Sequence, residues 1–202
     1  YKRQRFTLDG LERLADELDR DPAIDAVYGD WMVTKVENDG FESRPDKYVF
    51  GYPDFVPALL LFFQITTHAA LVRATCFDQI GLFDARLKVY GDRDWMLRFA
   101  MAGKQARHLP GVVGLYLENP TSIERSHPEA VSEGVALRNT YLESDCLWKL
   151  AGWSRPPASP REMARLYAVV GSLGKDCATR DGVPSSQLAF AAQCLIRALE
   201  AD

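Results

Sequence analysis

Short segments with the apolar spacing of helices alternate with strand-like segments over about the first 125 residues of this chain. Residues 8–18 carry leucines at helical intervals, and residues 24–30, "IDAVYGD", alternate as a strand does. Such alternation predicts an α/β fold, because a sheet and its helices cover each other's apolar faces. From about residue 126 the pattern is helical alone. We therefore expect a mixed sheet flanked by helices over residues 1–125 and a C-terminal helical extension over residues 126–202.

Local signals predict the individual elements. Residues 31–41 indicate a second strand that ends in an Asn-Asp-Gly turn, and residues 42–54 are polar and proline-containing, which predicts a loop. Leu59 to Phe63 indicates a buried helix, and residues 94–103 a helix that Gly103 ends. The same signals predict a helix cap at Thr7, a strand at 69–73, a capped short helix at 75–80, one bent or two short strands at 105–120, and helix starts near Ser126 and Ser159.

Composition narrows the classes of protein to consider. With 202 residues, 47% apolar and 26% charged, the chain has the balance of an ordinary soluble globular protein. Its net charge of −4 argues against a nucleic-acid partner, because binding to phosphates needs a basic surface. The longest apolar run, residues 55–63, is too short to cross a membrane. No secretory signal is visible, so we expect a cytoplasmic protein, at the membrane face if membrane-associated.

The cysteines indicate a reducing compartment. The four cysteines lie far apart in the sequence, without the spacing of a metal site, and each has apolar neighbours. We expect them to be buried free thiols, which suits the cytosol. They are Cys76, Cys146, Cys177 and Cys194.

Two aspartates stand out in "VYGDRDWMLR", residues 89–98, directly before an amphipathic segment. Asp92 and Asp94 are two apart, so on a helix they do not share a face. One of them could cap the helix while the other is a surface acid. Alternatively, the pair could bind a hard cation as an Asp-x-Asp motif, or one could act as a general base. Residue types alone favour the cap.

The order of motifs along the chain gives a more specific indication of function than the residue types do. Arg73 ends a strand, "IGLFD" (80–84) follows a short helix, and "GDRDWMLR" (91–98), "HLP" (108–110) and "LYLENPTSI" (115–123) come next. In this order and spacing the chain resembles the family 2 nucleotide-sugar glycosyltransferases. The resemblance covers roughly residues 5–125 and includes residues 8–30, which are similar to the helix and strand that follow the family's metal-binding Asp-x-Asp.

The resemblance implies a GT-A-like fold and sugar transfer, with inversion, from a nucleotide-diphosphate donor to a glycan or another acceptor hydroxyl. By position, Asp92 would be the general base, and Asp94 would begin the helix and orient the loop. Together with Asp94, three residues are candidates for substrate binding. The same likeness places His68 and Asp30 where the family lines its cleft, and Trp31 could stack on a sugar face. Their simpler interpretations are a loop or core histidine, a strand-end acid and a core aromatic. We expect Arg98 to pair with an acid such as Asp84.

The resemblance also implies what lies elsewhere. The family's donor-binding half, with the Asp-x-Asp that holds Mg²⁺ or Mn²⁺, precedes the segment matching Tyr1 onward. We therefore expect a piece of a longer enzyme, inactive by itself and with no metal bound to its own residues. Two positions depart from the family: Gly91 stands where a glutamate is usual, and Glu118-Asn119 where some relatives have a metal-binding histidine.

Two other functions fit the same residues. One is an inactive glycosyltransferase-like binding module whose helical tail recruits a partner or forms an oligomer. The other is a metal-dependent phosphotransferase that uses Asp92 and Asp94, although the chain lacks a phosphate-binding loop. The donor sugar and the acceptor have no readable signature in the sequence.

Overall fold

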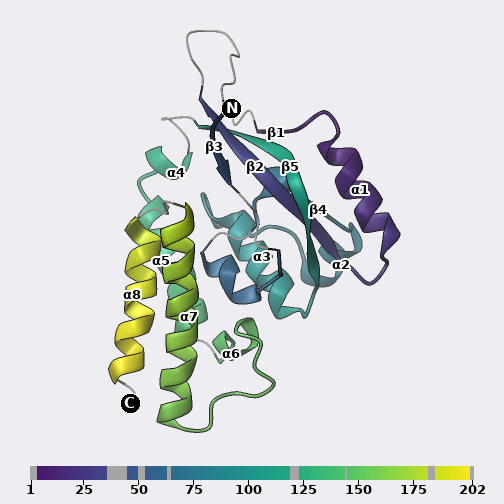
Figure 1. The fold of residues 1–202 in the computed structure, drawn as a ribbon. Coiled ribbons are helices and arrows are strands. Elements are labelled where there is room, and N and C mark those ends of the chain that lie inside the picture. The colour runs from purple at the N-terminus through teal and green to yellow at the C-terminus, as the bar shows by residue number, and fades with distance from the viewer. Residues whose placement is uncertain are drawn as a thin grey trace.

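The computed structural model describes residues 4–35, 45–49, 53–62, 65–118, 123–143, 145–181 and 185–200. The chain is a mixed α/β protein built on a five-stranded sheet. In Figure 1, helix α1 (Gly10–Arg20) lies on one side of the sheet. Helix α3 (Gly91–Met101) and the C-terminal helices lie on the other side.

The sheet is organised around two long strands. Strand β2 (Ala26–Lys35) pairs in parallel with β5 (Ala106–Glu118) along its whole length, with register shifts near Asp30. Its other edge carries β3 (Pro45–Val49) and β4 (Ala70–Val72), both antiparallel to it. The short strand β1 (Arg5–Phe6) pairs with β5. The sheet thus mixes parallel and antiparallel pairs.

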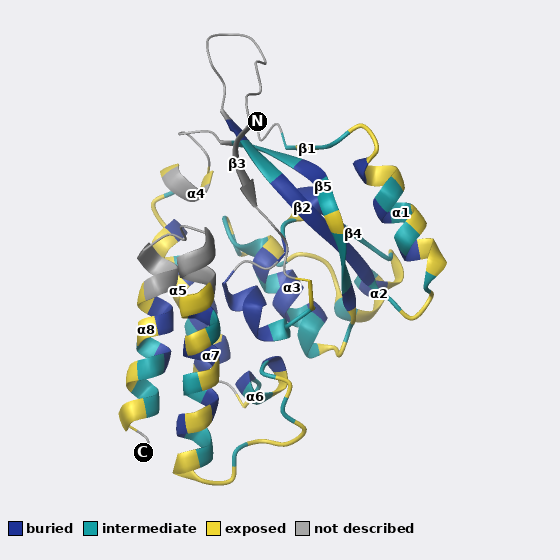
Figure 2. Ribbon diagram, viewed as in Figure 1, coloured by how far each residue is buried: buried dark blue, intermediate teal, exposed yellow. Residues whose placement is uncertain are grey.

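Alternate residues of β2 face two separate cores, as the period of two in a strand requires. Val27 and Trp31 pack against Leu14 and Leu18 of α1 in the smaller core. Ala26 and Tyr28 belong to the larger core on the α3 side. The buried stripe along the sheet and the buried faces of α1 and α3 are visible in Figure 2.

The larger core continues into the C-terminal helices. Leu137, Leu166 and Phe190 are buried in the same cluster as Phe62 and Trp95. Residues beyond 126 therefore pack directly against the sheet domain rather than standing apart from it. The remaining helices are the 3₁₀ helices η1 (Pro57–Leu61) and η2 (Thr67–Ala69), and α2 (Thr75–Ile80), α4 (Ile123–Ser126), α5 (Ala130–Glu143), α6 (Leu147–Leu150), α7 (Pro160–Asp181) and α8 (Ser185–Glu200).

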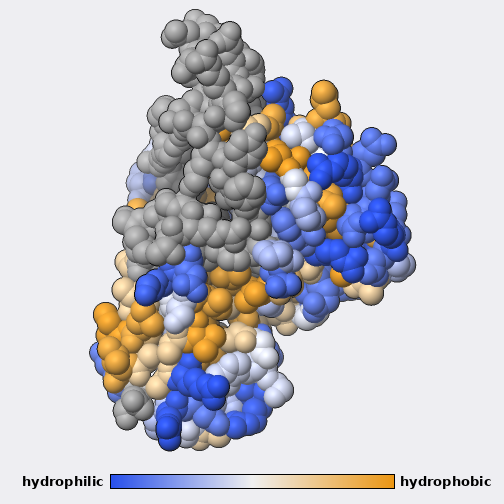
Figure 3. Space-filling view, in the orientation of Figure 1, coloured by the Kyte–Doolittle hydropathy of each residue, from blue (hydrophilic) through white to orange (hydrophobic). Residues whose placement is uncertain are grey.

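Surface character differs between the two ends of the chain. Figure 3 shows hydrophilic residues over α1 and a hydrophobic area over α8 on the same face of the molecule. On α8, Ile196 and Leu199 are 55% and 81% exposed. In the part of the chain that the structure describes, no helix is both long and apolar enough to cross a membrane.

Several predicted elements need correction. The two strands predicted at 24–30 and 31–41 are one strand, β2, because β5 pairs with it throughout. The hairpin partner of β2 is β3, inside the region predicted as a loop. A proline is tolerated there because it begins an edge strand. The predicted Asn-Asp-Gly turn lies outside the described residues.

Some helices also differ from the prediction in their type or in the residues at which they begin. The buried helix at Leu59 to Phe63 is the 3₁₀ helix η1 where it is described, and the predicted caps at Thr7 and Thr75 do not form, since the residues at the helix starts are Asp9 and Ala74. The prediction at Ser159 is confirmed: its hydroxyl accepts the N–H of Glu162 at 3.2 Å. Gly81 and Gly103 adopt positive φ angles after α2 and α3, as helix-ending glycines do.

The described cysteines agree with the expectation of free thiols. Cys76 and Cys194 are buried, Cys146 is half-buried, and none forms a disulfide. Burial raises the pKa of the Cys194 thiol to about 12. The side chain of Cys177 lies outside the described residues.

Candidate functional site

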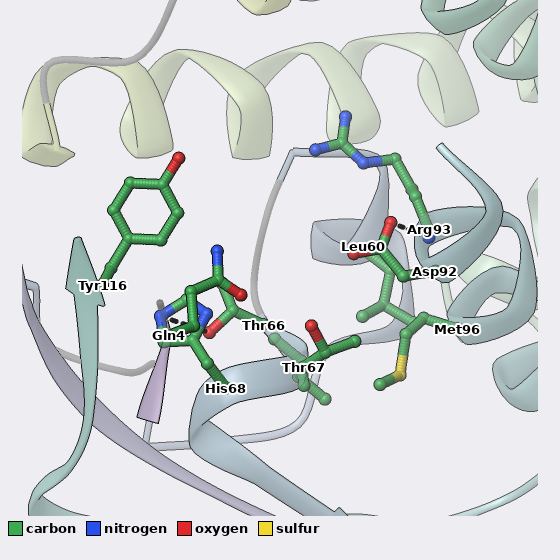
Figure 4. Close-up of a pocket in the computed structure, with 10 residues that line it drawn as sticks. Gln4, Leu60, Thr66, Thr67, His68, Asp92, Arg93, Met96 and Tyr116 are labelled. Atoms are coloured by element: carbon green, nitrogen blue, oxygen red, sulfur yellow. Dashed lines mark hydrogen bonds between the residues drawn. The ribbon is translucent and has the colours of Figure 1, made fainter. Parts of the chain in front are cut away.

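A cleft lies between the start of α3 and the edge of the sheet at β1 and β5. Its empty volume, including space open to solvent, is about 630 Å³. Figure 4 shows two facing walls: polar side chains from β5, η2 and the residues around them on one side, and α3 with η1 on the other. The lining residues are Gln4, Leu60, Ile65, Thr66, Thr67, His68, Asp92, Arg93, Met96 and Tyr116.

Asp92 belongs to the first turn of α3 and lines this cleft. Its side chain is exposed, and its Oδ1 accepts the N–H of Arg93 at 2.8 Å. Among the described residues, none donates a hydrogen bond to its other carboxylate oxygen. A negative charge at this end of a helix is favoured by the helix dipole. Asp92 thus presents an available carboxylate oxygen to the cleft.

Two aromatic residues of α3 anchor the helix in the core. The Trp95 indole donates a hydrogen bond to the carbonyl of Gly81 at 2.7 Å and stacks on Phe77 at 4.6 Å between ring centroids. Trp95 is 1% exposed and Phe99 fully buried. Because aromatic packing and this hydrogen bond fix the rotation of the helix about its axis, they also determine that Asp92 faces the cleft.

Asp94 points elsewhere. Its Oδ2 accepts the Nε–H of Arg98 at 2.8 Å, and Arg98 also donates to the carbonyls of Ile80 and Leu82. Arg98 thus pairs with an acid, as expected, but the suggested partner Asp84 is paired with Arg86 instead. Arg98 pairs with Asp94 because residues four apart are neighbours on a helix.

Neither aspartate caps α3. The helix begins at Gly91, three residues earlier than predicted, and its N-cap residue is Tyr90, without a side-chain cap. The expectation that Asp94 begins or caps the helix was therefore wrong. A carboxylate from the C-terminal region binds the backbone just before the helix.

That carboxylate is Glu133 of α5. Its two oxygens accept the backbone N–H groups of Lys88, Val89 and Tyr90 at 2.8, 2.8 and 2.7 Å. The sequence analysis did not identify Glu133. It lies 43 residues from Tyr90, and no local pattern connects a glutamate in a helix with a distant backbone segment.

His68 lies on the wall facing Asp92 (Figure 4). It is 8% exposed, and its Nε2 lies 3.4 Å from the hydroxyl oxygen of Thr66. Its ring packs edge-on against Trp31 at 5.9 Å and near Tyr116 at 5.3 Å between centroids. His68 is therefore both part of the packing and part of the cleft wall, while Trp31 supports it from the smaller core.

Asp30 is engaged in a buried hydrogen-bonded group. The residue is 6% exposed, its Oδ1 lies 2.8 Å from Nε2 of His108, and its Oδ2 accepts the N–H of Gly111 at 2.9 Å. These bonds occur where the β2–β5 register shifts. Asp30 and Trp31 are not among the residues that line the described cleft.

Arg93 is a lining residue that the sequence analysis missed. It is 6% exposed, and its guanidinium carbon lies 5.1 Å from the centroid of the Tyr90 ring. In Figure 4 its side chain extends from the same helical turn as Asp92. A buried arginine within an amphipathic helix carries no sequence signal that separates it from a surface arginine.

The described residues show no metal site. No group of three or more histidine, cysteine, aspartate or glutamate side chains among them is placed to hold an ion. Asp92 and Asp94 do not converge, because Asp94 is paired with Arg98.

Comparison with known proteins adds no identification. A scan against models of protein families and a search of curated proteins both find no match.

Proposed function

We propose that this chain is the acceptor-side part of an inverting GT-A-like glycosyltransferase in which Asp92 is the general base. The observation that carries the proposal is the placement of Asp92. It is an exposed carboxylate in the first turn of a core-anchored helix, and it faces a polar cleft wall.

In the proposed reaction Asp92 accepts the proton of an acceptor hydroxyl. The hydroxyl oxygen attacks the anomeric carbon, the bond from that carbon to the diphosphate breaks, and the nucleoside diphosphate leaves. A base in this role needs an ionised oxygen within hydrogen-bond reach of the hydroxyl. In this proposal the carboxylate of Asp92 fills this role from its position in the cleft wall, where its Oδ1 also accepts the Arg93 N–H.

The facing wall supplies groups suited to a sugar or another polyhydroxy acceptor. Thr66, Thr67 and His68 line the cleft opposite Asp92. Hydroxyl and imidazole groups can donate and accept hydrogen bonds, as sugar hydroxyls do. We assign acceptor binding to this wall, with Trp31 supporting the His68 ring.

The divalent cation implied by the resemblance would neutralise charge on the leaving diphosphate. In this proposal its Asp-x-Asp ligands and the donor pocket belong to a preceding part of the enzyme. The present residues contribute the base and the acceptor wall.

The test is the substitution Asp92→Asn in the complete gene product. Nucleoside diphosphate release is measured with UDP-glucose, UDP-galactose, UDP-N-acetylglucosamine and GDP-mannose, with Mg²⁺ or Mn²⁺ and methyl glycosides as acceptors. Loss of the base should lower kcat by about 10²- to 10⁴-fold. Donor affinity, measured by calorimetry, should stay within about threefold of the wild type, since Asp92 does not bind the donor diphosphate in this proposal.

Asp78→Asn is the matched control, because Asp78 is also an exposed aspartate in the first turn of a helix. Turnover that survives in Asp92→Asn would remove Asp92 as the base. Donor affinity that collapses with turnover would make it a ligand instead. A wild-type protein that binds sugars without releasing nucleotide would favour the inactive binding module.

A further inference from the structure

The three residues that precede α3 turn their backbone N–H groups toward one point. Lys88, Val89 and Tyr90 all donate to the carboxylate of Glu133, at 2.7 to 2.8 Å. Successive N–H groups that converge in this way form an anion-binding concavity. Here the anion is a side chain of α5, from a part of the sequence outside the glycosyltransferase resemblance.

The contact favours an ionised glutamate. Burial raises the pKa of Glu133, but the hydrogen bonds from Tyr90, Lys88 and Val89 lower it, and nearby His127 adds to the lowering. The net result is a pKa below the ordinary glutamate value. Hydrogen bonds to an ionised acceptor are shorter and stronger than neutral ones, so the glutamate holds the segment as a charged group.

The neighbouring residue brings α5 close to the same segment. Gly134 is buried, and a Cβ atom placed on it would lie 2.7 Å from the Tyr90 ring. Only glycine permits this approach without displacement of the ring. The Tyr90 ring also interacts with the guanidinium of Arg93, which lines the cleft beside Asp92. A chain of direct contacts therefore runs from α5 to the cleft wall.

We propose that Glu133 is a positioning residue that holds residues 88–90 and thereby places Asp92 in the cleft. The role rests on the proposed function of Asp92, but the physical contact does not. Asp92 lies only two residues beyond the held segment, in the first turn of α3. The core contacts of Trp95 fix the helix at its middle, whereas Glu133 fixes the chain entering it.

The distinguishing experiment compares Glu133→Gln with Glu129→Gln. Glu129 is an exposed glutamate one helical turn earlier, so its substitution removes the same charge without touching the segment. Amide hydrogen exchange of residues 88–90 is measured on the chain, and kcat and KM on the complete gene product with the donors named above. Amides of β2 and β5 report in the same samples whether the fold is intact.

For Glu133→Gln we expect exchange at residues 88–90 to rise about tenfold while β2 and β5 stay protected. We expect kcat to fall about 10- to 100-fold, since a small misplacement of a catalytic group costs that much, with the donor KM within about twofold. Glu129→Gln should leave both unchanged. Unchanged exchange in Glu133→Gln overturns the contact, and faster exchange with unchanged kcat overturns the positioning role.

A wild-type measurement covers the case in which Glu133→Gln does not fold. The side-chain carboxyl of Glu133 and the amides of residues 88–90 are followed by NMR as pH is lowered. The amides should shift together with the titration of Glu133, and independent titration overturns the proposal. If the wild type releases no nucleotide from any donor, the proposed function fails, and these amides still report whether Glu133 holds the segment.

Discussion

Asp30 and Asp92 are both aspartates predicted to face a cleft, yet the structure places them in opposite environments. Asp30 is 6% exposed and both of its carboxylate oxygens are engaged by His108 and Gly111. Asp92 is exposed, and one recorded hydrogen bond, from the neighbouring Arg93 N–H, reaches its carboxylate. A buried acid with satisfied oxygens stabilises a fold, whereas an exposed acid on a rigid helix is available for proton transfer.

The largest expected difference is in activity. Asp92→Asn should lower turnover by about 10²- to 10⁴-fold. Its free energy of unfolding should change by no more than about 0.5 kcal/mol, because the side chain is exposed. Turnover and urea unfolding measured on the same preparation check this. A destabilisation as large as that of an Asp30 variant would break the contrast between the two sites.

Asp30→Ala should show the opposite profile and lower the free energy of unfolding by about 3 kcal/mol. The substitution leaves the buried imidazole of His108 and the half-buried N–H of Gly111 without their acceptor. Urea unfolding at neutral pH measures the loss. A change below about 1 kcal/mol would mean that Asp30 is not the structural member of the pair.

Glu133 extends the contrast, because it is a half-buried acid whose two oxygens are both engaged by backbone N–H groups. Glu133→Gln should lower the free energy of unfolding by about 2 kcal/mol at pH 7 through loss of charge-assisted hydrogen bonds. The folded-state pKa of Glu133 is lowered from the ordinary 4.5. Its stabilisation is therefore complete above pH 4.5 and is lost as pH falls through the lower folded-state value.

The measurement is urea unfolding of wild type and Glu133→Gln across this range. The difference between them should be constant near neutral pH and shrink in acid. A difference that grows as pH falls would contradict the direction of the pKa shift.

Gly134→Ala tests the close packing behind the cleft. The added methyl group would lie 2.7 Å from the Tyr90 ring. The free-energy cost of this overpacking should exceed the stabilisation that alanine gains from its higher helix propensity. We expect a net loss of about 1 kcal/mol. Gly91→Ala is the control, because the nearest atom to its Cβ lies 3.8 Å away, and thermal unfolding of the two variants should separate them.

The smallest effect is expected at Asp94. Asp94→Asn removes the ion pair with Arg98, but Arg98 keeps its hydrogen bonds to the carbonyls of Ile80 and Leu82. A half-buried pair of this kind contributes about 0.5 to 1 kcal/mol. Thermal unfolding at low and high salt measures it. A loss above about 2 kcal/mol would place Asp94 with Asp30 among the structural acids.

Much of the fold could be read from periodicity. The positions of α1, α2 and β4, the cap of α7 at Ser159 and the ends at Gly81 and Gly103 follow from signals within a few residues. The errors have a common cause. The extent of β2 and the existence of β3 depend on pairing with distant strands, and pairing is a long-range interaction that local propensity does not report.

The residues of the candidate site also divide into those that local sequence signals located and those that they did not. The motif order located Asp92 and His68, which the structure brings to facing walls of one cleft. The sequence also suggested Asp30 and Trp31, which do not line that cleft. Asp30 is hydrogen-bonded to Gly111, and Trp31 packs in the smaller core. Arg93 and Glu133 gave no signal, because an arginine on a helix and a glutamate on a helix look alike whether they face solvent or a neighbouring segment.

The sequence by itself determined the elements whose causes are local: apolar spacing, glycine stops, a serine cap and the pair of acids before an amphipathic helix. Only the tertiary structure decided which acid is buried, which is exposed and which backbone segment Glu133 holds. The physical reason is that burial and hydrogen-bond satisfaction depend on what other parts of the chain bring into contact. Asp30 and Asp92 carry the same side chain, and their neighbours in space make one structural and the other available for chemistry.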